Sequence, residues 1–388
     1  MSEKLLHHFV PRYYFRLFNG GKRFIHLLRR ANGSVVRFAS VRGQCARRKF
    51  YGSTAIENSL ADLEGHHATV LSAITQFART GRALSLSVEG FNILSQAILL
   101  QRSRTPRALN VLVSGGKDLL LHVFHEYVKS RIDLPNRETL LAAARAGNVP
   151  VPNRDVVELI MSMSISLRSV AALSDLSLVL LRNASAFPFL MSDAPVVLYN
   201  RHFWHEKSYG VLGFQSRGLL IFFPLTPALQ LMLYDATTYS VTASDSVVVV
   251  FADSDVAQLN ALQLHSSVEA VYFAEPEHAS HAHDLYRLHR PLLSAATSEF
   301  LVHSPGSIMV DGKPNVNDVM HVFEPHLPVL VDLSFIPRTP ITTWGRDNSV
   351  RNPAILQSLD TAFESTRTMR GISVEAFLGE LFKVVAEK

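Results

Sequence analysis

The sequence predicts an α+β protein in which a helical amino-terminal half with a small β-hairpin packs on a mainly antiparallel sheet, followed by a carboxy-terminal extension. Of its 388 residues, 47% are hydrophobic, which is enough for a large core. Apolar residues recur at helical spacing through most of residues 54–173. After Leu176 they form short runs rich in β-branched residues instead, a pattern typical of strands.

The chain opens with an unusually reactive stretch, in which two imidazoles, two guanidinium groups and two phenols fall within ten residues. His7 and His8 should be extended. Pro11 should begin a helix, because proline at a first helical position loses no backbone hydrogen bond. This helix should end at Phe18, before Asn19 and two glycines.

A hairpin and a series of helices should follow. Asn32 and Gly33 lie between the apolar runs 23–28 and 35–38, and Asn-Gly between such runs is a strong hairpin signal. The helices are expected at residues 54–79, 88–102, 107–131, 137–146 and 155–173, most of them separated by prolines.

Short strands should form the sheet of the second half. They are expected at residues 178–181, 188–191, 196–199, 219–223, 229–233 and 247–251, with a helix at 253–268. The uncharged stretch 218–234 is too short to span a bilayer as a helix and contains Pro224 and Pro227. We expect two core strands joined through this Pro-Leu-Thr-Pro segment, and no membrane partner.

The composition divides the chain into a main domain at residues 1–275 and a carboxy-terminal extension at residues 276–388. The extension is richer in His, Pro and Gly and lacks clear periodicity before Pro353. Two helices, near residues 354–368 and 374–386, should end it. We expect the extension to wrap the main domain or to pair with a second copy in a homo-oligomer.

The formal net charge of +5 suits an anionic partner such as nucleic acid, RNA or DNA. Lys and Arg are concentrated between Lys22 and Arg48, a stretch without acids, which is also the pattern of a solvated hairpin face. The single cysteine, Cys45, excludes an internal disulfide and fits a reducing compartment. The first residues have no signal-like apolar run, so we expect a cytoplasmic protein.

An ordered set of short motifs carries a resemblance to a known family. It comprises His8-Phe9-Val10-Pro11-Arg12-Tyr13-Tyr14, Arg47-Arg48-Lys49-Phe50-Tyr51, Arg104-Thr105-Pro106, Ser192-Asp193-Ala194-Pro195 and Phe223-Pro224-Leu225-Thr226-Pro227. In this set the chain resembles the uncharacterised family called domain of unknown function 4238, over roughly residues 7 to 275. The resemblance helps to select residues but implies no particular activity.

The helix at residues 54–79 places three chemically capable side chains on one face. Glu57 and Glu64 are two turns apart, and His67 follows one turn later. Glu64 and His67 have the Glu-x-x-His spacing of di-metal helical sites, but those sites take a second such pair from another helix, and none is evident. A metal at Glu57, Glu64 and His67 therefore stays open beside a catalytic carboxylate or a hydrogen-bonded pair.

Other recognisable catalytic and cofactor motifs are missing from the sequence. It has no Walker loop, no dinucleotide fingerprint, no paired Cys-x-x-Cys and no His-Glu-x-x-His. We therefore expect no cofactor and no obligatory metal. The late histidines His278, His281 and His283 could hold a metal, but they fall in chain without periodicity and should instead be exposed to solvent.

Three arginines, Arg102, Arg104 and Arg107, mark the junction between two predicted helices. Each guanidinium presents a planar fork that suits phosphate recognition. The same side chains could equally cap helix carbonyls or pair with Glu57 and Glu64.

Asp193 follows Ser192 in a polar loop between two apolar strands. It is either a turn residue bonded to its own backbone or part of a site. Because a buried carboxylate is costly without a partner, we expect Arg12 or Arg104 to provide one.

These candidates lead to one hypothesis, in which the opening turn, the Glu57 helix, the Arg104 junction and the Asp193 loop converge in a polar pocket. The catalytic candidates are His8, Arg12, Tyr14, Glu57, Arg104 and Asp193. His8 would act as acid or base, because an imidazole exchanges protons near neutral pH. Arg12 and Arg104 would hold an anion and Tyr14 would orient it. Glu57 and Asp193 would position the other groups.

Such a pocket is typical of a nuclease-like hydrolase that cleaves phosphodiester bonds, such as those of RNA, without an obligatory metal. The alternative is a non-catalytic binding or interaction protein, in which the same residues form a structural polar network.

Overall fold

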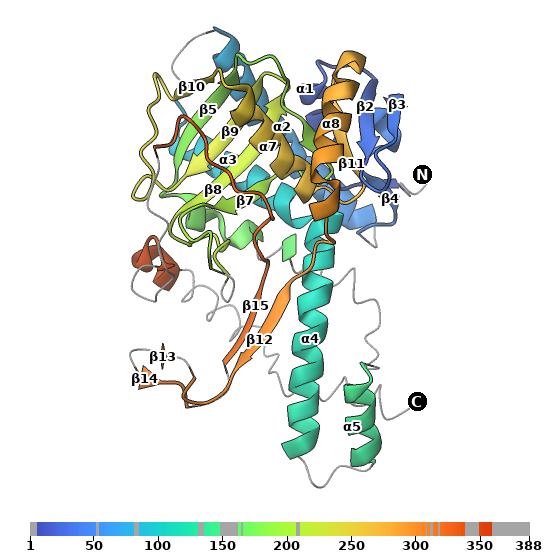
Figure 1. Ribbon diagram of the computed structural model, residues 1–388, viewed down its shortest axis with the longest axis vertical. Helices are drawn as coiled ribbons and strands as arrows, with labels where there is room; N and C mark the ends of the chain where they lie inside the picture. Colours follow the sequence, from blue (N-terminus) through green and yellow to red (C-terminus); the bar gives the residue numbers. More distant parts are fainter. Residues whose placement is uncertain are drawn as a thin grey trace.

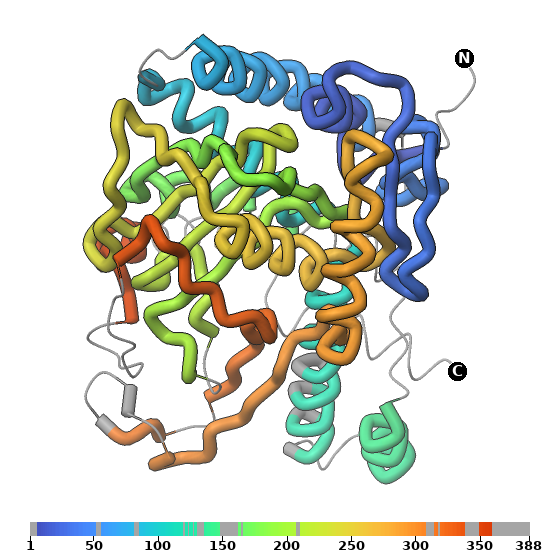
Figure 2. Tube along the Cα trace, turned by 45° about the horizontal axis from the view of Figure 1, so that its top comes forward, coloured from blue at the N-terminus to red at the C-terminus, as the bar shows by residue number. Residues whose placement is uncertain are grey.

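A computed structural model describes residues 6–51, 54–80, 85–130, 136–147, 162–163, 166–206, 210–307, 309–310, 313–316, 319–337 and 349–358. It confirms the α+β class (Figure 1). Helices and sheets form one main body, and α4 (Pro106–Ser130) projects from it with α5 (Arg137–Arg145) beside its far end. Figure 2 shows the same body with α2 (Thr54–Thr80) along its upper edge.

The opening turn forms as predicted. The extended histidines belong to β1 (Leu6–His8), which pairs antiparallel with β4 (Ala46–Arg48) after the short 3-10 helix η1 (Val41–Gly43). Helix α1 (Arg12–Phe18) follows Pro11 directly, and its Phe15 and Phe18 are buried. Gly20 and Gly21 take positive φ angles of 69° and 86°, so they end the helix in a conformation that favours glycine.

The predicted hairpin is the outer half of a four-stranded sheet with strand order β3-β2-β11-β6. Strands β2 (Phe24–Arg29) and β3 (Val35–Ser40) flank Gly33, whose φ is 71°. The other two strands are β11 (Ala270–Phe273) and β6 (Met191–Ser192), and every pair in this sheet is antiparallel. Strand β2 of the hairpin therefore pairs with chain more than 240 residues away.

The larger sheet has the strand order β10-β5-β9-β8-β7. Its strands are β5 (Ser177–Asn183), β7 (Val197–Asn200), β8 (Leu219–Thr226), β9 (Leu229–Tyr234) and β10 (Val247–Val250). Only the β10–β5 pair is parallel. The expectation that β8 ends before Pro224 is wrong: the strand continues to Thr226 with a register shift beside Pro224, and the turn lies at Pro227 and Ala228.

Helices on both faces cover this larger sheet. In β8 the alternate residues Leu219, Ile221 and Phe223 join the core of α1, α2 and α3 (Val88–Ser103). Leu220 and Phe222 point the other way, into the core of α7 (Asp253–Ser266) and α8 (Ala279–His289). Because both faces of β8 are covered, all eight of its residues are buried.

The helices of the first half match the predicted ranges closely. In the predicted helix at 155–173 the structure describes residues 162–163 and 166–173, of which Val170–Leu173 form the 3-10 helix η2. The rest of that range lies outside the described residues. No helix in the described ranges is long and apolar enough to cross a membrane.

The chain after residue 275 contains more regular structure than its sequence suggests. The 3-10 helix η3 (Pro276–His278) leads into α8, which packs on α7 and β2, and η4 (Arg290–Leu292) follows. Strands β12 (Glu299–His303) and β15 (Val319–Phe323) form an antiparallel pair beside α4, with the short β13 (Met309–Val310) and β14 (Lys313–Pro314) between them in sequence. The expectation of irregular chain is therefore wrong here.

Of the late histidines, His281 shows the same correction, whereas His283 is exposed as expected. His281 lies on α8, where its ring stacks on Phe187 at 4.2 Å between centroids and its Nε2 is 3.2 Å from Asn260 Nδ2. Its side chain is half-buried rather than open to solvent.

The last described residues lie along the main body. The Tyr199 hydroxyl donates to the Val329 carbonyl and accepts from the Val331 amide. Arg351 pairs with Asp175 at 2.8 Å. Residues 353–358 begin the first predicted terminal helix, and the second, at 374–386, lies outside the described residues.

Candidate functional site

Three of the four segments predicted to converge do meet. Side chains from β1, α1, α2 and the α3–α4 junction form what we call the amino-terminal cluster. Its members are His8, Tyr13, Tyr51, Glu57, Glu64 and Arg104, each acting electrostatically on others of the set.

Arg104 is the buried centre of this cluster. Its side chain is 1% exposed, and Nη1 donates to Glu64 Oε1 at 2.7 Å. Nε and Nη2 donate to Gln101 Oε1 at 3.3 and 3.2 Å. Burial is the largest single influence and would lower the pKa of the guanidinium, but the charge and hydrogen bond of Glu64, together with Tyr51 and Tyr13, outweigh burial and raise it. Arg104 is therefore a permanent cation whose hydrogen bonds are used within the protein.

His8 presents one ring nitrogen that is not used. Its Nε2 lies 3.1 Å from the Arg42 carbonyl oxygen, and because a carbonyl only accepts, Nε2 carries the proton of the neutral ring. Within the described part of the chain, Nδ1 has no hydrogen-bond partner. Partial burial lowers the pKa of His8, and the positive charges of Arg12 and Arg104 act in the same direction. The ring is therefore neutral at pH 7, with a free acceptor.

Neighbouring groups hold the backbone of His8 in place. The Tyr51 hydroxyl donates to the His8 carbonyl at 3.0 Å, and Glu57 is hydrogen-bonded to the His8 backbone. His7 is buried; its Nδ1 accepts from the Tyr51 amide at 3.1 Å and its ring stacks on that of Tyr51. Partial burial raises the pKa of Glu57, and repulsion from Glu64 adds to the effect.

Arg12 is the exposed cation of the site. It is the first residue of α1, and its charge acts on the His8 ring. In the described residues its guanidinium has no ion pair or hydrogen bond. It is therefore available to an anion from solution, unlike Arg104.

Tyr14 lies outside the cluster. Its hydroxyl donates to the Pro224 carbonyl, and its ring stacks on Phe223 with 4.9 Å between centroids. The side chain is 1% exposed, so it joins α1 to β8 in the core. The phenol of α1 that interacts electrostatically with Arg104 and Glu64 is Tyr13.

Asp193 is also placed elsewhere, and the expectation that Arg12 or Arg104 pairs with it is wrong. Its carboxylate accepts the backbone amides of Val268 at 2.8 Å and Glu269 at 2.6 Å. It thus fixes the turn before β11. Burial raises the pKa of Asp193 to about 6, although these two hydrogen bonds act in the opposite direction.

The junction arginines follow the alternatives left open by the sequence. Arg104 pairs with a helix carboxylate, Glu64, while Arg107 Nη1 donates to the His265 carbonyl at the end of α7. Two residues were hard to select from the sequence: Tyr51, a member of the cluster, and Gln101, which accepts hydrogen bonds from Arg104. Gln101 lies one turn before Arg104 on α3, a spacing that could have indicated it.

The possible metal ligands do not assemble into a site. Within the described ranges, no three His, Cys, Asp or Glu side chains gather in a metal-binding group. His67 is 1% exposed, and its Nε2 has no hydrogen-bond partner among the described residues. Burial, together with the charges of Arg104 and His66, lowers the pKa of His67 to about 4.

The low pKa of His67 should make the protein acid-sensitive. His67 takes up a proton near pH 6.5 in the unfolded chain but only near pH 4 in the folded chain. Its contribution to the free energy of unfolding is therefore complete above pH 6.5 and is lost as the pH falls toward 4. At pH 5 the loss should be about 2 kcal/mol. Urea unfolding at pH 7.5 and pH 5.0 measures it.

The variant His67→Phe should lose less stability than the wild type between these two pH values, because it has no imidazole to protonate. The neighbouring His66→Phe is the matched control, since His66 is exposed on the same helix. Equal pH sensitivity of wild type and His67→Phe would contradict the assignment.

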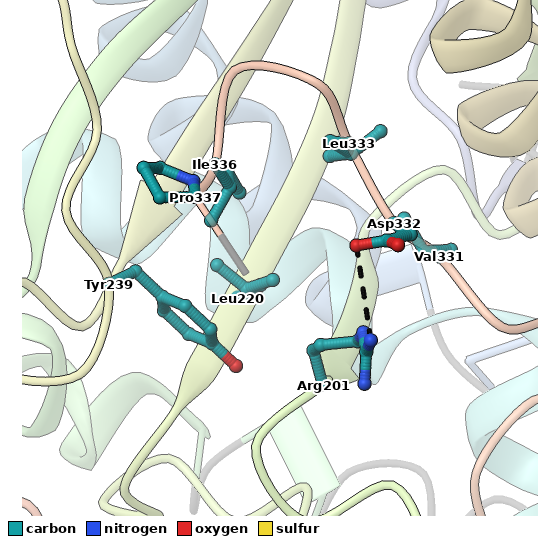
Figure 3. A pocket seen from close by; sticks show the side chains of 8 residues that line it. All are labelled: Arg201, Leu220, Tyr239, Val331, Asp332, Leu333, Ile336 and Pro337. Atoms are coloured by element: carbon teal, nitrogen blue, oxygen red, sulfur yellow. Dashed lines mark ion pairs between the residues drawn. The ribbon is translucent and has the colours of Figure 1, made fainter. Parts of the chain in front are cut away.

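A small pocket lies under the chain that crosses the larger sheet (Figure 3). Arg201 and Asp332 face each other across it at 3.9 Å, and Tyr239 forms another part of its wall. Its volume of about 20 Å³ is enough for a water molecule, so it is not a substrate site.

Comparison with known proteins adds a family but no activity. The family model described as protein of unknown function (DUF4238) matches residues 6–277. No curated protein matches the chain, and no solved structure does.

Proposed function

Because the chain belongs to the DUF4238 family of proteins of unknown function, whose description names no activity, we propose a function from the chemistry of its side chains. The proposal is a nuclease-like hydrolase that cleaves phosphodiester bonds in RNA without an obligatory metal. The amino-terminal cluster is its active site, with His8 as the catalytic base and Arg12 as the anion-binding residue.

The observation that carries this proposal is the state of the His8 ring. Its proton is held on Nε2 by the Arg42 carbonyl, so Nδ1 is left as an acceptor with no partner among the described residues. A base in this state can take the proton of an RNA 2′-hydroxyl. The 2′ oxygen then attacks phosphorus, the bond to the 5′ oxygen breaks, and water protonates the leaving oxygen. The product of this first step is a 2′,3′-cyclic phosphate, and attack of water on its phosphorus, with the 2′ oxygen leaving, completes the hydrolysis to a 3′-phosphate.

The charges around His8 suit a phosphodiester. Arg12 is exposed and unpaired in the described residues, so its planar fork can bind the two non-bridging oxygens. Arg104 and Glu57 are positioning residues in this scheme, because Arg104 is buried and Glu57 is bonded to the His8 backbone. Tyr14 and Asp193 have no part in it, since both bond to backbone groups elsewhere.

One observation favours the alternative of a non-catalytic protein. Arg104 is fully buried and bonded to Glu64 and Gln101, as expected for a structural network. In that case His8 and Arg12 only lie beside this structural network, and the purified protein does not cleave RNA.

Arg12→Ala should weaken substrate binding and spare the chemical step. Loss of one charge-assisted contact to phosphate should raise KM about tenfold and leave kcat within about twofold. Initial rates on a single-stranded RNA, measured in EDTA, test this. Arg16→Ala is the matched control, because Arg16 is exposed one turn later on α1 and does not act on His8.

Substrate analogues separate the two functions. RNA carrying 2′-O-methyl groups should be resistant, because it lacks the attacking hydroxyl, and DNA should be resistant for the same reason. Cleavage of DNA as fast as RNA would contradict the step in which the 2′-hydroxyl attacks. If none of these substrates is cleaved, the non-catalytic alternative is favoured.

A further inference from the structure

A second and larger cavity is lined by Arg102 and Ser103, at the junction between α3 and α4. Its volume is about 380 Å³, within the range of small-molecule pockets. Its walls come from the end of α3, the first turns of α4, the loop at residues 210–214, and β15 with Glu324. Chain from both sides of residue 277 therefore encloses it, so the carboxy-terminal extension completes a cavity begun by the family-matched region.

The polar end of this cavity carries an excess of positive charge. Glu324 pairs with Arg102, and it accepts two hydrogen bonds from Arg107, at 3.0 Å from Nε and 2.7 Å from Nη2. The three side chains are 9% to 13% exposed. Two guanidinium groups against one carboxylate leave a net charge of +1 in a site largely shielded from water.

Arg102 is the residue that can offer this charge to a ligand. It lines the cavity, and its Nη2 donates to Glu324. Across the described residues, its Nε and Nη1 make no hydrogen bond. Arg107, by contrast, also donates from Nη1 to the His265 and Ser266 carbonyls. Unused donors on a buried cation are costly unless a ligand or water accepts them.

The rest of the wall is largely apolar. Val111 and Leu112 of α4, Leu212 and Phe214 of the facing loop, and Val322 of β15 line it. Four of them are only partly buried, and Val322 is 42% exposed, so apolar surface is open to the cavity. A cation at one end and aliphatic walls beyond it are complementary to an anionic head on an apolar body.

We propose that this cavity binds a small amphipathic anion, a carboxylate or phosphate monoester with a medium-length aliphatic body, through Arg102. The anionic head accepts from Nε and Nη1 of Arg102, and the aliphatic body packs against Val111, Leu212 and Phe214. The binding site is separate from the amino-terminal cluster, so it does not depend on RNA cleavage.

Isothermal titration of the full chain with four probes tests the charge and the body of the ligand. Octanoate and octyl phosphate should bind, and the tighter of the two identifies the head group. Acetate lacks the body and octylamine carries the opposite charge, so neither should bind. Equal binding of octylamine and octanoate, or no heat from any probe at 5 mM, would overturn the proposal.

Variants assign the binding to this cavity. Arg102→Gln should weaken octanoate binding at least tenfold, and Val111→Trp should do the same by filling the space while the Arg102–Glu324 pair stays intact. Glu324→Gln should bind octanoate more tightly than the wild type, since it removes the competing anion. Lys117→Gln, which deletes an exposed charge from α4, should bind as the wild type does. Unchanged binding in folded Val111→Trp would overturn the site.

Discussion

His8→Gln should reduce RNA cleavage by a factor of about 10² to 10⁴, the range expected for loss of a general base. Glutamine can still donate to the Arg42 carbonyl and fills similar space, but it cannot take a proton. The loss should appear in kcat, with KM nearly unchanged, because Arg12 and the rest of the binding surface remain. Single-turnover cleavage in EDTA measures the chemical step directly.

The pH profile distinguishes a base from a merely structural histidine. His8 must be neutral to accept a proton, and burial lowers its pKa below 6.5. kcat/KM of the wild type should therefore fall as the pH drops through that lowered pKa, and should be level above it until another group titrates. In His8→Gln the remaining activity should lack this acidic limb.

His66→Gln serves as the control, because His66 is an exposed histidine on the neighbouring helix α2. It should cleave at the wild-type rate with the same pH profile. Wild-type cleavage by His8→Gln would remove His8 from the mechanism, whatever the RNA-degrading activity of the preparation.

Local sequence signals were sufficient for the elements near this site. Pro11, the two glycines after Asn19 and the Asn32-Gly33 pair define α1 and the hairpin, because proline and glycine restrict or permit specific backbone angles. Long-range pairing could not be predicted in the same way. Nothing within residues 24–40 indicates that β2 will pair with β11, since register depends on a partner more than 240 residues away.

In the candidate site, too, local features could be predicted from the sequence and long-range contacts could not. The sequence marks Glu64 as a charge on a helix face and Arg104 as a charge at a helix junction, and in the structure the two side chains pair at 2.7 Å. Two backbone amides satisfy the Asp193 carboxylate, whereas the sequence suggests a side-chain partner. Every residue type except proline has a backbone amide, so the sequence cannot show which amides will lie beside a carboxylate. The sequence favours Tyr14 for the site, but Tyr13 occupies it, and the reason is the geometry of the helix. Consecutive helical residues point about 100° apart, and the sequence did not determine which face of α1 meets β8.

Glu64→Gln should produce the largest loss of stability in the cluster. Arg104 is 1% exposed and stays charged, so removal of its carboxylate leaves a buried cation without a counterion. Loss of one partner of a buried pair typically costs about 3 to 5 kcal/mol. Because Glu64 is 23% exposed and water can partly replace it, we expect about 3 kcal/mol, measured by urea unfolding at pH 7.5.

The double variant Glu64→Gln with Arg104→Met should recover much of this loss, since it removes the stranded cation and fills its space with an apolar side chain. Arg104→Met alone should cost less than Glu64→Gln, because the orphaned carboxylate reaches solvent and the orphaned guanidinium does not. Asp62→Asn, an exposed charge change on the same helix, should shift the unfolding free energy by no more than about 0.5 kcal/mol. If the two single losses simply add in the double variant, the Glu64–Arg104 pair is not the electrostatic centre of this cluster.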